Sequence, residues 1–93
     1  MLTVEQKYRT YADLKRYGNW SISRQLKKGI HITEELYDMT RDLVELYEDM
    51  VYYIELDHAD TKEFHKTHKN YRQCCKIIVK TIKEDNKRHV KST

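Results

Sequence analysis

Histidines are the residues of this chain whose type and spacing come nearest to a metal site. His65 and His68 are three residues apart, so on a helix they share one face, and His58 precedes His65 by seven residues. Imidazoles together with a carboxylate such as Asp49 could hold a divalent metal ion. The sequence has no repeated Glu-x-x-His pair. We therefore expect no metal site and no cofactor.

Cysteine and arginine offer two further kinds of chemistry. Cys74 and Cys75 are adjacent, and their side chains would point about 100° apart on a helix, which prevents an easy disulfide. Cys75 falls in an apolar stripe, where a thiol stays protonated and inert. Arg24 and His31 in "RQLKKGIH" resemble the Arg-x(4–6)-His signature of HEPN-type ribonucleases. Because Gly29 should end the helix between them, we expect no catalytic residue and no enzyme.

A series of lysines runs along the segment that should form the last helix. Its members recur every three, four or seven residues, on the side opposite Tyr71 and Ile78, so they face solvent or a partner. We call this set the lysine stripe: Lys62, Lys66, Lys69, Lys76, Lys80 and Lys83. Several lysines on one face could neutralise nucleic-acid phosphates. Exposed lysines also solubilise a surface without binding anything, so both interpretations stay open.

Eight tyrosines and one tryptophan give the chain more amphipathic rings than a core of this size needs. Tyr and Trp favour interfaces because one end of each side chain is apolar and the other is polar. The candidate interface residues are Tyr8, Tyr11, Trp20, Tyr47 and Tyr53. The alternatives are that these rings fill a core poor in Leu and Phe, or that exposed rings stack on bases.

Helices must position all these side chains, because the chain has no proline and only two glycines. Thr3 and Gln6 form a capping box, and Gly18 closes the first helix. Ser21 should cap a short second helix that ends at Gly29. Residues 1–31 thus predict two N-terminal helices.

Residues 32–88 predict a long antiparallel helical hairpin. Thr33 and two following acids start a helix over about 34–57, whose apolar seam runs from Leu36 to Ile54. Asp60 with Glu63 starts the second helix, over about 61–87. The short connection forces the chain to reverse direction. Two residues, one on each helix, whose numbers add to about 117 should therefore lie side by side at the same height along the hairpin. We expect an all-α fold with the two shorter helices packed on this hairpin, in a single helical domain over 1–93 with a frayed tail at 89–93.

Charge is segregated along the chain. Residues 1–32 carry a net charge of +5, residues 33–57 carry −8, and residues 58–93 carry +6. Flanking charges pair across helical interfaces, so we expect Asp38, Asp42 and Asp49 to meet basic side chains of the last helix. The acids that open "TEELYDMTRD" exclude this segment as a recognition helix in a DNA groove.

The composition of the chain limits where the protein can be located and what kind of organism it comes from. No run of 18 apolar residues exists and the N-terminal residues are charged, so we expect no membrane span, no signal peptide and a cytoplasmic protein. Lys, Ile, Asn, Tyr and Phe make up 31 of the 93 residues. Their codons are AT-rich, which favours a low-GC bacterium or a phage or other mobile element as the source.

Two functions agree with these patterns. The first is a small non-enzymatic interaction protein that forms a homo-oligomer through its aromatic hairpin face and docks onto a protein partner, for example as a phage-encoded inhibitor of a host protein. The alternative is a nucleic-acid or phosphate-ligand binder that uses the lysine stripe. The sequence pI of about 8.8 lies below the value typical of nucleic-acid-binding domains.

Overall fold

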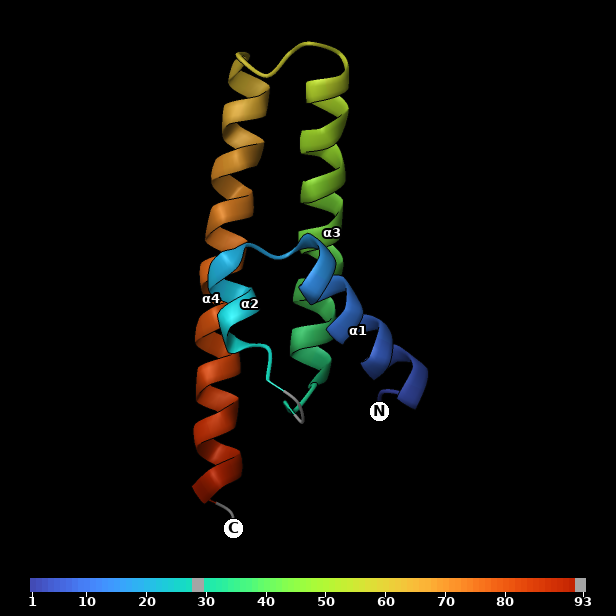
Figure 1. The fold of residues 1–93 in the computed structure, drawn as a ribbon, viewed down its shortest axis with the longest axis vertical. Helices are drawn as coiled ribbons and strands as arrows, with labels where there is room; N and C mark the ends of the chain where they lie inside the picture. Colours follow the sequence, from blue (N-terminus) through green and yellow to red (C-terminus); the bar gives the residue numbers. More distant parts are fainter. Residues whose placement is uncertain (28–29, 92–93) are drawn as a thin grey trace.

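Four α-helices make up the protein. The computed structural model describes residues 1–27 and 30–91, with side chains as far as Lys87. In chain order the helices are α1 (Val4–Tyr17), α2 (Trp20–Gln25), α3 (Glu34–Glu55) and α4 (Lys62–Lys91), and the described residues include no strand (Figure 1). The predicted all-α hairpin with two shorter helices packed on it is confirmed.

The ends of α1 follow the sequence signals. The Gln6 backbone N–H donates to the Thr3 hydroxyl at 3.1 Å, and the Thr3 N–H donates to the Gln6 side chain at 2.8 Å, which completes the predicted capping box. The Gly18 N–H donates to the Leu14 carbonyl at 3.0 Å and ends the helix. A methyl group at Gly18 would meet that carbonyl oxygen and lie 2.9 Å from Ile22 Cγ2. Glycine therefore permits the close turn between α1 and α2.

The predicted bounds of α2 are wrong. The N-cap is Asn19, whose side chain accepts the Ile22 N–H at 3.1 Å, and not Ser21, which lies inside the first turn. An Asn side chain caps as well as a Ser hydroxyl and stands directly after the Gly18 turn. The helix ends at Gln25. Gly29, where we expected its end, lies outside the described residues.

The hairpin forms as expected, with shifted ends. Thr33 caps α3 and accepts the Leu36 N–H at 3.1 Å. The helix ends at Glu55, short of residue 57, because Asp57 adopts a left-handed φ of 60° that reverses the chain. Thr61 rather than Asp60 accepts an N–H from the first turn of α4, that of Phe64 at 3.3 Å.

The far end of α4 also differs from expectation. The helix continues to Lys91, beyond the end predicted at residue 87, so most of the expected frayed tail at 89–93 has helical backbone. Ser92 and Thr93 lie outside the described residues. No helix in the described part of the chain is long and apolar enough to cross a membrane.

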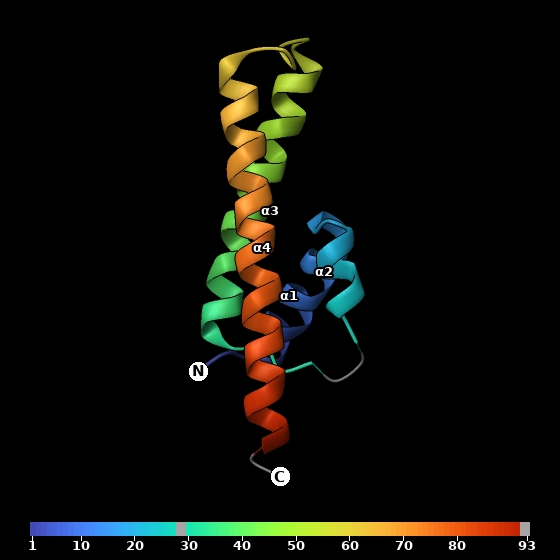
Figure 2. The ribbon, with the colours of Figure 1, turned by 90° about the vertical axis from the view of Figure 1, so that its left-hand side faces the viewer.

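The helices form two layers. The hairpin is one layer, and α1 and α2 cover one face of it, with α1 against α3 and α2 against α4 (Figure 2). Arg41 of α3 pairs with Asp13 of α1, and the Tyr71 hydroxyl of α4 donates to the Tyr17 carbonyl at 2.6 Å. The buried apolar residues lie between the layers: Leu14, Ile22, Ile32, Leu36, Leu43, Tyr71, Cys75, Ile78 and Ile82.

The half of the hairpin nearest its turn extends past α1 and α2 (Figure 1). Ile54, which we placed in the apolar seam, is 54% exposed there because neither N-terminal helix reaches it.

Tyr47 and Tyr71 pack with ring centroids 6.1 Å apart, and Met39 contacts both Cys74 and Thr81. These contacts agree with the predicted register.

Candidate functional site

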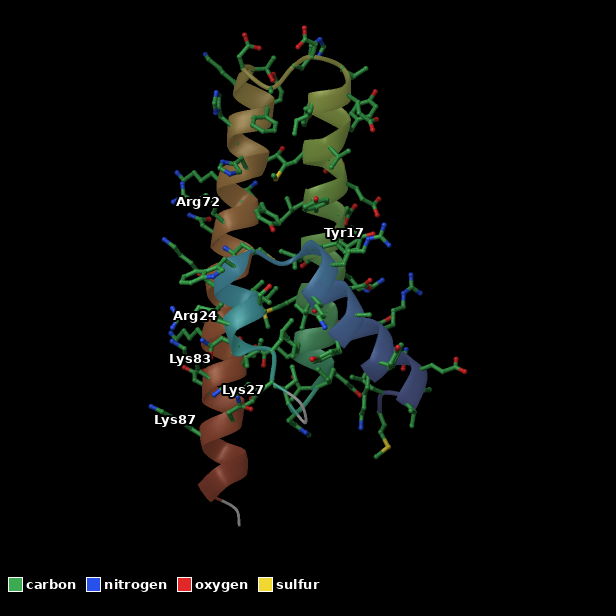
Figure 3. All side chains as sticks on the ribbon, viewed as in Figure 1. Tyr17, Arg24, Lys27, Arg72, Lys83 and Lys87 are labelled. Atoms are coloured by element: carbon green, nitrogen blue, oxygen red, sulfur yellow. The ribbon has the colours of Figure 1, made fainter. Side chains whose placement is uncertain are left out.

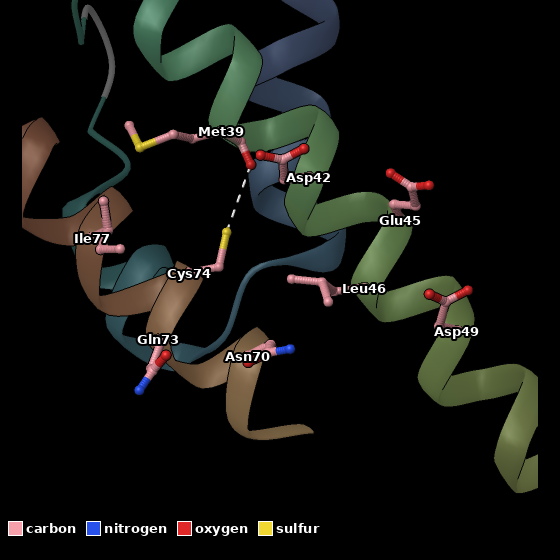
Figure 4. Close-up of a pocket in the computed structure, with 9 residues that line it drawn as sticks. All are labelled: Met39, Asp42, Glu45, Leu46, Asp49, Asn70, Gln73, Cys74 and Ile77. Carbon is pink, nitrogen blue, oxygen red and sulfur yellow. Dashed lines mark hydrogen bonds between the residues drawn. The ribbon is translucent and has the colours of Figure 1, made fainter. Parts of the chain in front are cut away.

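A groove runs between α3 and α4 on the face of the hairpin that α1 and α2 leave open (Figure 4). Its volume is about 440 Å³. Four side chains make an apolar floor: Met39, Leu46, Cys74 and Ile77. Five polar side chains make the rim: Asp42, Glu45 and Asp49 of α3, and Asn70 and Gln73 of α4. We call this site the acidic groove.

Helical spacing explains why these residues share one site. Met39 and Leu46 are seven residues apart on α3, as are Asp42 and Asp49, so each pair follows one line along the helix. On α4, Gln73 and Ile77 are four residues apart and lie one turn from each other. The hairpin register then sets these lines side by side.

The carboxylates of the rim have no cationic partner within the described side chains. The ion pairs among the described residues join the Met1 amino group to Glu34, and Arg9 and Arg41 to Asp13. None of these ion pairs joins α3 to α4. The predicted pairing of Asp38, Asp42 and Asp49 with the last helix is therefore wrong. The physical reason is that α4 turns neutral side chains, such as Asn70 and Gln73, toward the groove, while its lysines point elsewhere.

Cys74 is the titratable group on the floor of the groove. Its Sγ lies 3.7 Å from the Met39 carbonyl oxygen, to which the thiol donates (Figure 4). Burial, followed by the neighbouring Cys75 and by Asp42, raises the pKa of Cys74 to about 11. Burial likewise raises the pKa of Cys75, which is 1% exposed. Both thiols are therefore protonated near neutral pH and are poor nucleophiles.

The lysine stripe lies on the solvent side of α4, and all six of its side chains are exposed. Packing of α2 on α4 brings further cations beside it, which the sequence alone did not reveal. Figure 3 shows Arg24, Arg72, Lys83 and Lys87 extending from α2 and α4 on the same side of the molecule. We call the combined set the basic surface: the lysine stripe with Arg24, Lys27, Arg72 and Lys87.

The five candidate interface aromatics do not gather on one face. Tyr8 is 77% exposed on α1, and Trp20 is 71% exposed on α2, where the Arg24 guanidinium lies 4.6 Å from its ring centroid. Tyr11 is half-buried on α1. Tyr47 is half-buried and packs edge-on against Tyr17, with ring centroids 5.2 Å apart.

Tyr53, the fifth of these aromatics, lies near the hairpin turn. It is half-buried, and its ring centroid is 6.1 Å from that of Tyr52. A second hollow, of about 360 Å³, opens on the α1 side of α3. Tyr47 and Tyr52 line it together with Glu48 and Glu55. The aromatic candidates thus divide among several surfaces.

Two of the histidines that could have bound a metal pack against Phe64, whose ring centroid lies 5.9 Å from that of His65. The His68 ring stacks on Phe64, with centroids 6.0 Å apart and planes 3° apart. Among the residues that the structure describes, no three His, Cys, Asp or Glu side chains could hold a metal ion together. Arg24 lies in α2 and His31 lies beyond its end, so one helix does not carry both.

Sequence reasoning missed the groove because two of its signals were weak. Ile77 lies off the apolar stripe of α4 and is 55% exposed, and an isolated exposed apolar residue is common on protein surfaces. Glu45, Asn70 and Gln73 look like ordinary surface residues.

No family model matches the chain, and neither does any curated protein or solved structure.

Proposed function

We propose that this chain is a non-enzymatic interaction protein whose acidic groove binds a basic amphipathic helix of a protein partner. The observation that carries the proposal is the rim of Asp42, Glu45 and Asp49, which borders an apolar floor and has no cation within the described side chains. An amphipathic helix binds a groove through apolar residues spaced three and four apart. Basic residues on its flanks would meet the acidic rim.

The groove supports binding better than catalysis. General acid–base or nucleophilic catalysis needs an activated group held against the reacting atoms. The Cys74 thiol has a pKa of about 11 and donates to a backbone carbonyl, so it is not activated. The proposal includes a cytoplasmic location, and the free thiols of Cys74 and Cys75 support it because they suit a reducing compartment.

A direct test is to titrate the protein into a labelled basic amphipathic peptide of about 20 residues, long enough to span the groove, and to follow fluorescence anisotropy. Asp42→Lys combined with Asp49→Lys should weaken binding at least tenfold, since reversing two exposed pairs costs roughly 1.4 kcal/mol or more. Ile77→Asp should weaken binding as well, because it places a charge on the apolar floor.

The matched control is Glu48→Lys combined with Glu55→Lys. These acids have the same seven-residue spacing on α3 and the same change of net charge, but they line the hollow on the α1 side. We expect this control to bind the peptide as the unmodified protein does at about 0.15 M salt, where distant exposed charges are screened. Equal loss of binding in both double variants would contradict a specific role for the groove.

A second candidate function, binding of single-stranded nucleic acid, is favoured by the position of Trp20. This exposed ring, with Arg24 over it, lies on the helix that extends the basic surface. Aromatic rings beside a basic groove stack on successive bases. Trp20 is the only tryptophan in the chain, so quenching of its fluorescence by an oligonucleotide reports binding there. Absence of quenching at low salt would remove this candidate.

A further inference from the structure

We infer that the partner that covers the acidic groove is a second copy of this chain, whose basic helix α4 lies along α3 beside the groove in a parallel face-to-face dimer. The inference rests on the proposed function, namely that the groove binds a basic helix. It goes further by naming that helix. Two observations support it, namely the heights of the charged residues and their position around each helix, and two-fold symmetry would then bring opposite charges together.

The first observation concerns height along the hairpin. Tyr47 lies beside Tyr71, and Met39 lies between Cys74 and Thr81, so residues whose numbers add to about 117 are level. Three exposed acids of α3 then match three exposed lysines of α4: Asp49 with Lys66, Glu45 with Lys69, and Asp38 with Lys80. The two members of each pair differ in height by at most three residues, which is about 4.5 Å along the helix axis.

The second observation concerns position around each helix. The spacings within the two sets are four and seven residues on α3, and three and eleven residues on α4. All four spacings are close to whole numbers of turns at about 3.6 residues per turn, so each set follows one line. On α3 this line runs beside the rim residue Asp42, and on α4 it runs beside Ile77 on the floor. Within one chain the two lines lie on opposite outer flanks of the groove and form no ion pair.

Two-fold symmetry determines which of these lines would meet in a dimer. A two-fold axis that runs along the groove, parallel to the helices, lays α3 of one copy on α4 of the other with all heights preserved. The acids of one copy then face the lysines of the partner on both flanks. A two-fold axis perpendicular to the helices would instead lay α3 on α3, with acid against acid. Charge therefore selects the parallel dimer.

The groove floor supplies the apolar centre of this contact. Ile77 is 55% exposed in the single chain, and it would be buried together with Leu46 and Cys74 near the two-fold axis. The molecule measures 50 × 23 × 19 Å. Its open hairpin face can accommodate the roughly 800 Å² per partner that a stable interface buries. Glu84 of α4, seven residues after Ile77, would lie level with Thr33, near the positive N-terminal end of α3 in the partner.

Sedimentation equilibrium on the full chain tests the inference. We expect a mass of twice 11.4 kDa at micromolar to submillimolar concentration. A basic variant with Asp38→Lys, Glu45→Lys and Asp49→Lys should be monomeric. An acidic variant with Lys66→Glu, Lys69→Glu and Lys80→Glu should also be monomeric. Their equimolar mixture should form a dimer, because each variant then presents the charge that the other needs.

The matched control reverses three exposed cations of α1, which packs on the opposite face of the hairpin: Lys7→Glu, Lys15→Glu and Arg16→Glu. This control has the same net charge as the acidic variant and should stay dimeric. Circular dichroism should show the same helix content in all variants, which separates loss of assembly from loss of fold.

Orientation is tested with a spin label attached at Asp60→Cys, near the hairpin turn. In a parallel dimer the two labels should lie within about 30 Å, roughly the width of the stacked hairpins at about 10 Å per helix. In the perpendicular-axis dimer they would be separated by a distance close to the 50 Å length of the molecule, and that result would overturn the inference.

Two further outcomes separate the inference from the proposed function. A chain that is monomeric at every concentration but binds the basic peptide through Asp42 and Asp49 would overturn the dimer and leave the proposed function standing. A monomeric chain that also fails to bind the peptide would overturn both. A dimer that the basic and acidic variants leave intact would show that the contact uses another face, and would overturn the inference.

Discussion

Replacing Gly18 with alanine should destabilise the protein through a collision at the α1–α2 junction. The new methyl group would meet the Leu14 carbonyl oxygen and lie 2.9 Å from Ile22 Cγ2 and 3.0 Å from Ile22 Cβ. Ile22 is fully buried in α2 and the carbonyl belongs to the backbone of α1, so neither can move without displacing one of these two helices. The φ of Gly18 is −75°, so alanine would cause no backbone strain, and the collision is the only destabilising effect in the folded state.

The magnitude follows from two opposing terms. Overpacking of a core site costs about 1–3 kcal/mol. The smaller conformational entropy of the unfolded alanine chain returns about 0.4–1 kcal/mol. The net loss should therefore be roughly 1–2 kcal/mol, which lowers the Tm of a domain of this size by about 5–15 °C. Ser23→Ala, on the exposed side of α2, is the control and should change Tm little.

Thermal unfolding followed by circular dichroism at 222 nm measures the difference. A Gly18→Ala protein that melts at or above the temperature of the unmodified chain would refute the expected collision. That result would mean that α2 adjusts to the methyl group at no cost, and that the tight α1–α2 turn does not fix the position of α2 on α4.

Two further predictions concern the thiols. The pKa of Cys74 is raised from its ordinary value of 9.0 to about 11, so folding favours the protonated thiol, and stability present below about pH 9 should be lost as pH rises toward 11. Burial raises the pKa of Tyr71 and of Cys75 and acts in the same direction, so urea midpoints should fall over this range. If they stay constant, the thiols are not buried as described. Cys75→Ala should cost on the order of 1 kcal/mol, because it leaves a small cavity at a buried site. It should leave peptide binding unchanged, and a loss of binding without a loss of stability would show that Cys75 has a direct role.

The hairpin could be predicted from the sequence because its signals are local. Thr33 with the acids that follow it, the apolar period of α3 and the short reversal before α4 each act within a few residues. The errors at helix ends have local causes as well. Asn19 competed with Ser21, and Thr61 with Asp60, as N-caps of similar strength, and sequence alone does not decide between them.

The acidic groove could not be predicted because it depends on which face of the hairpin stays open. Sequence periodicity placed Asp42 and Asp49 on a flank of α3 but could not show that α1 and α2 would both pack on the other face. We therefore expected these acids to be neutralised within the chain. The lysine stripe was correctly placed in solvent, whereas the contribution of Arg24 depends on where α2 docks.

The most direct test of the central claim, that the acidic groove is the binding site, is a map of backbone amide chemical shifts as the basic amphipathic peptide is added. We expect the largest changes at the groove residues of both helices, from Met39 to Asp49 and from Asn70 to Ile77. Amides on the outer face of α1, such as that of Tyr8, should not move. Changes that centre on the basic surface around Trp20, or no changes at saturating peptide, would contradict the account.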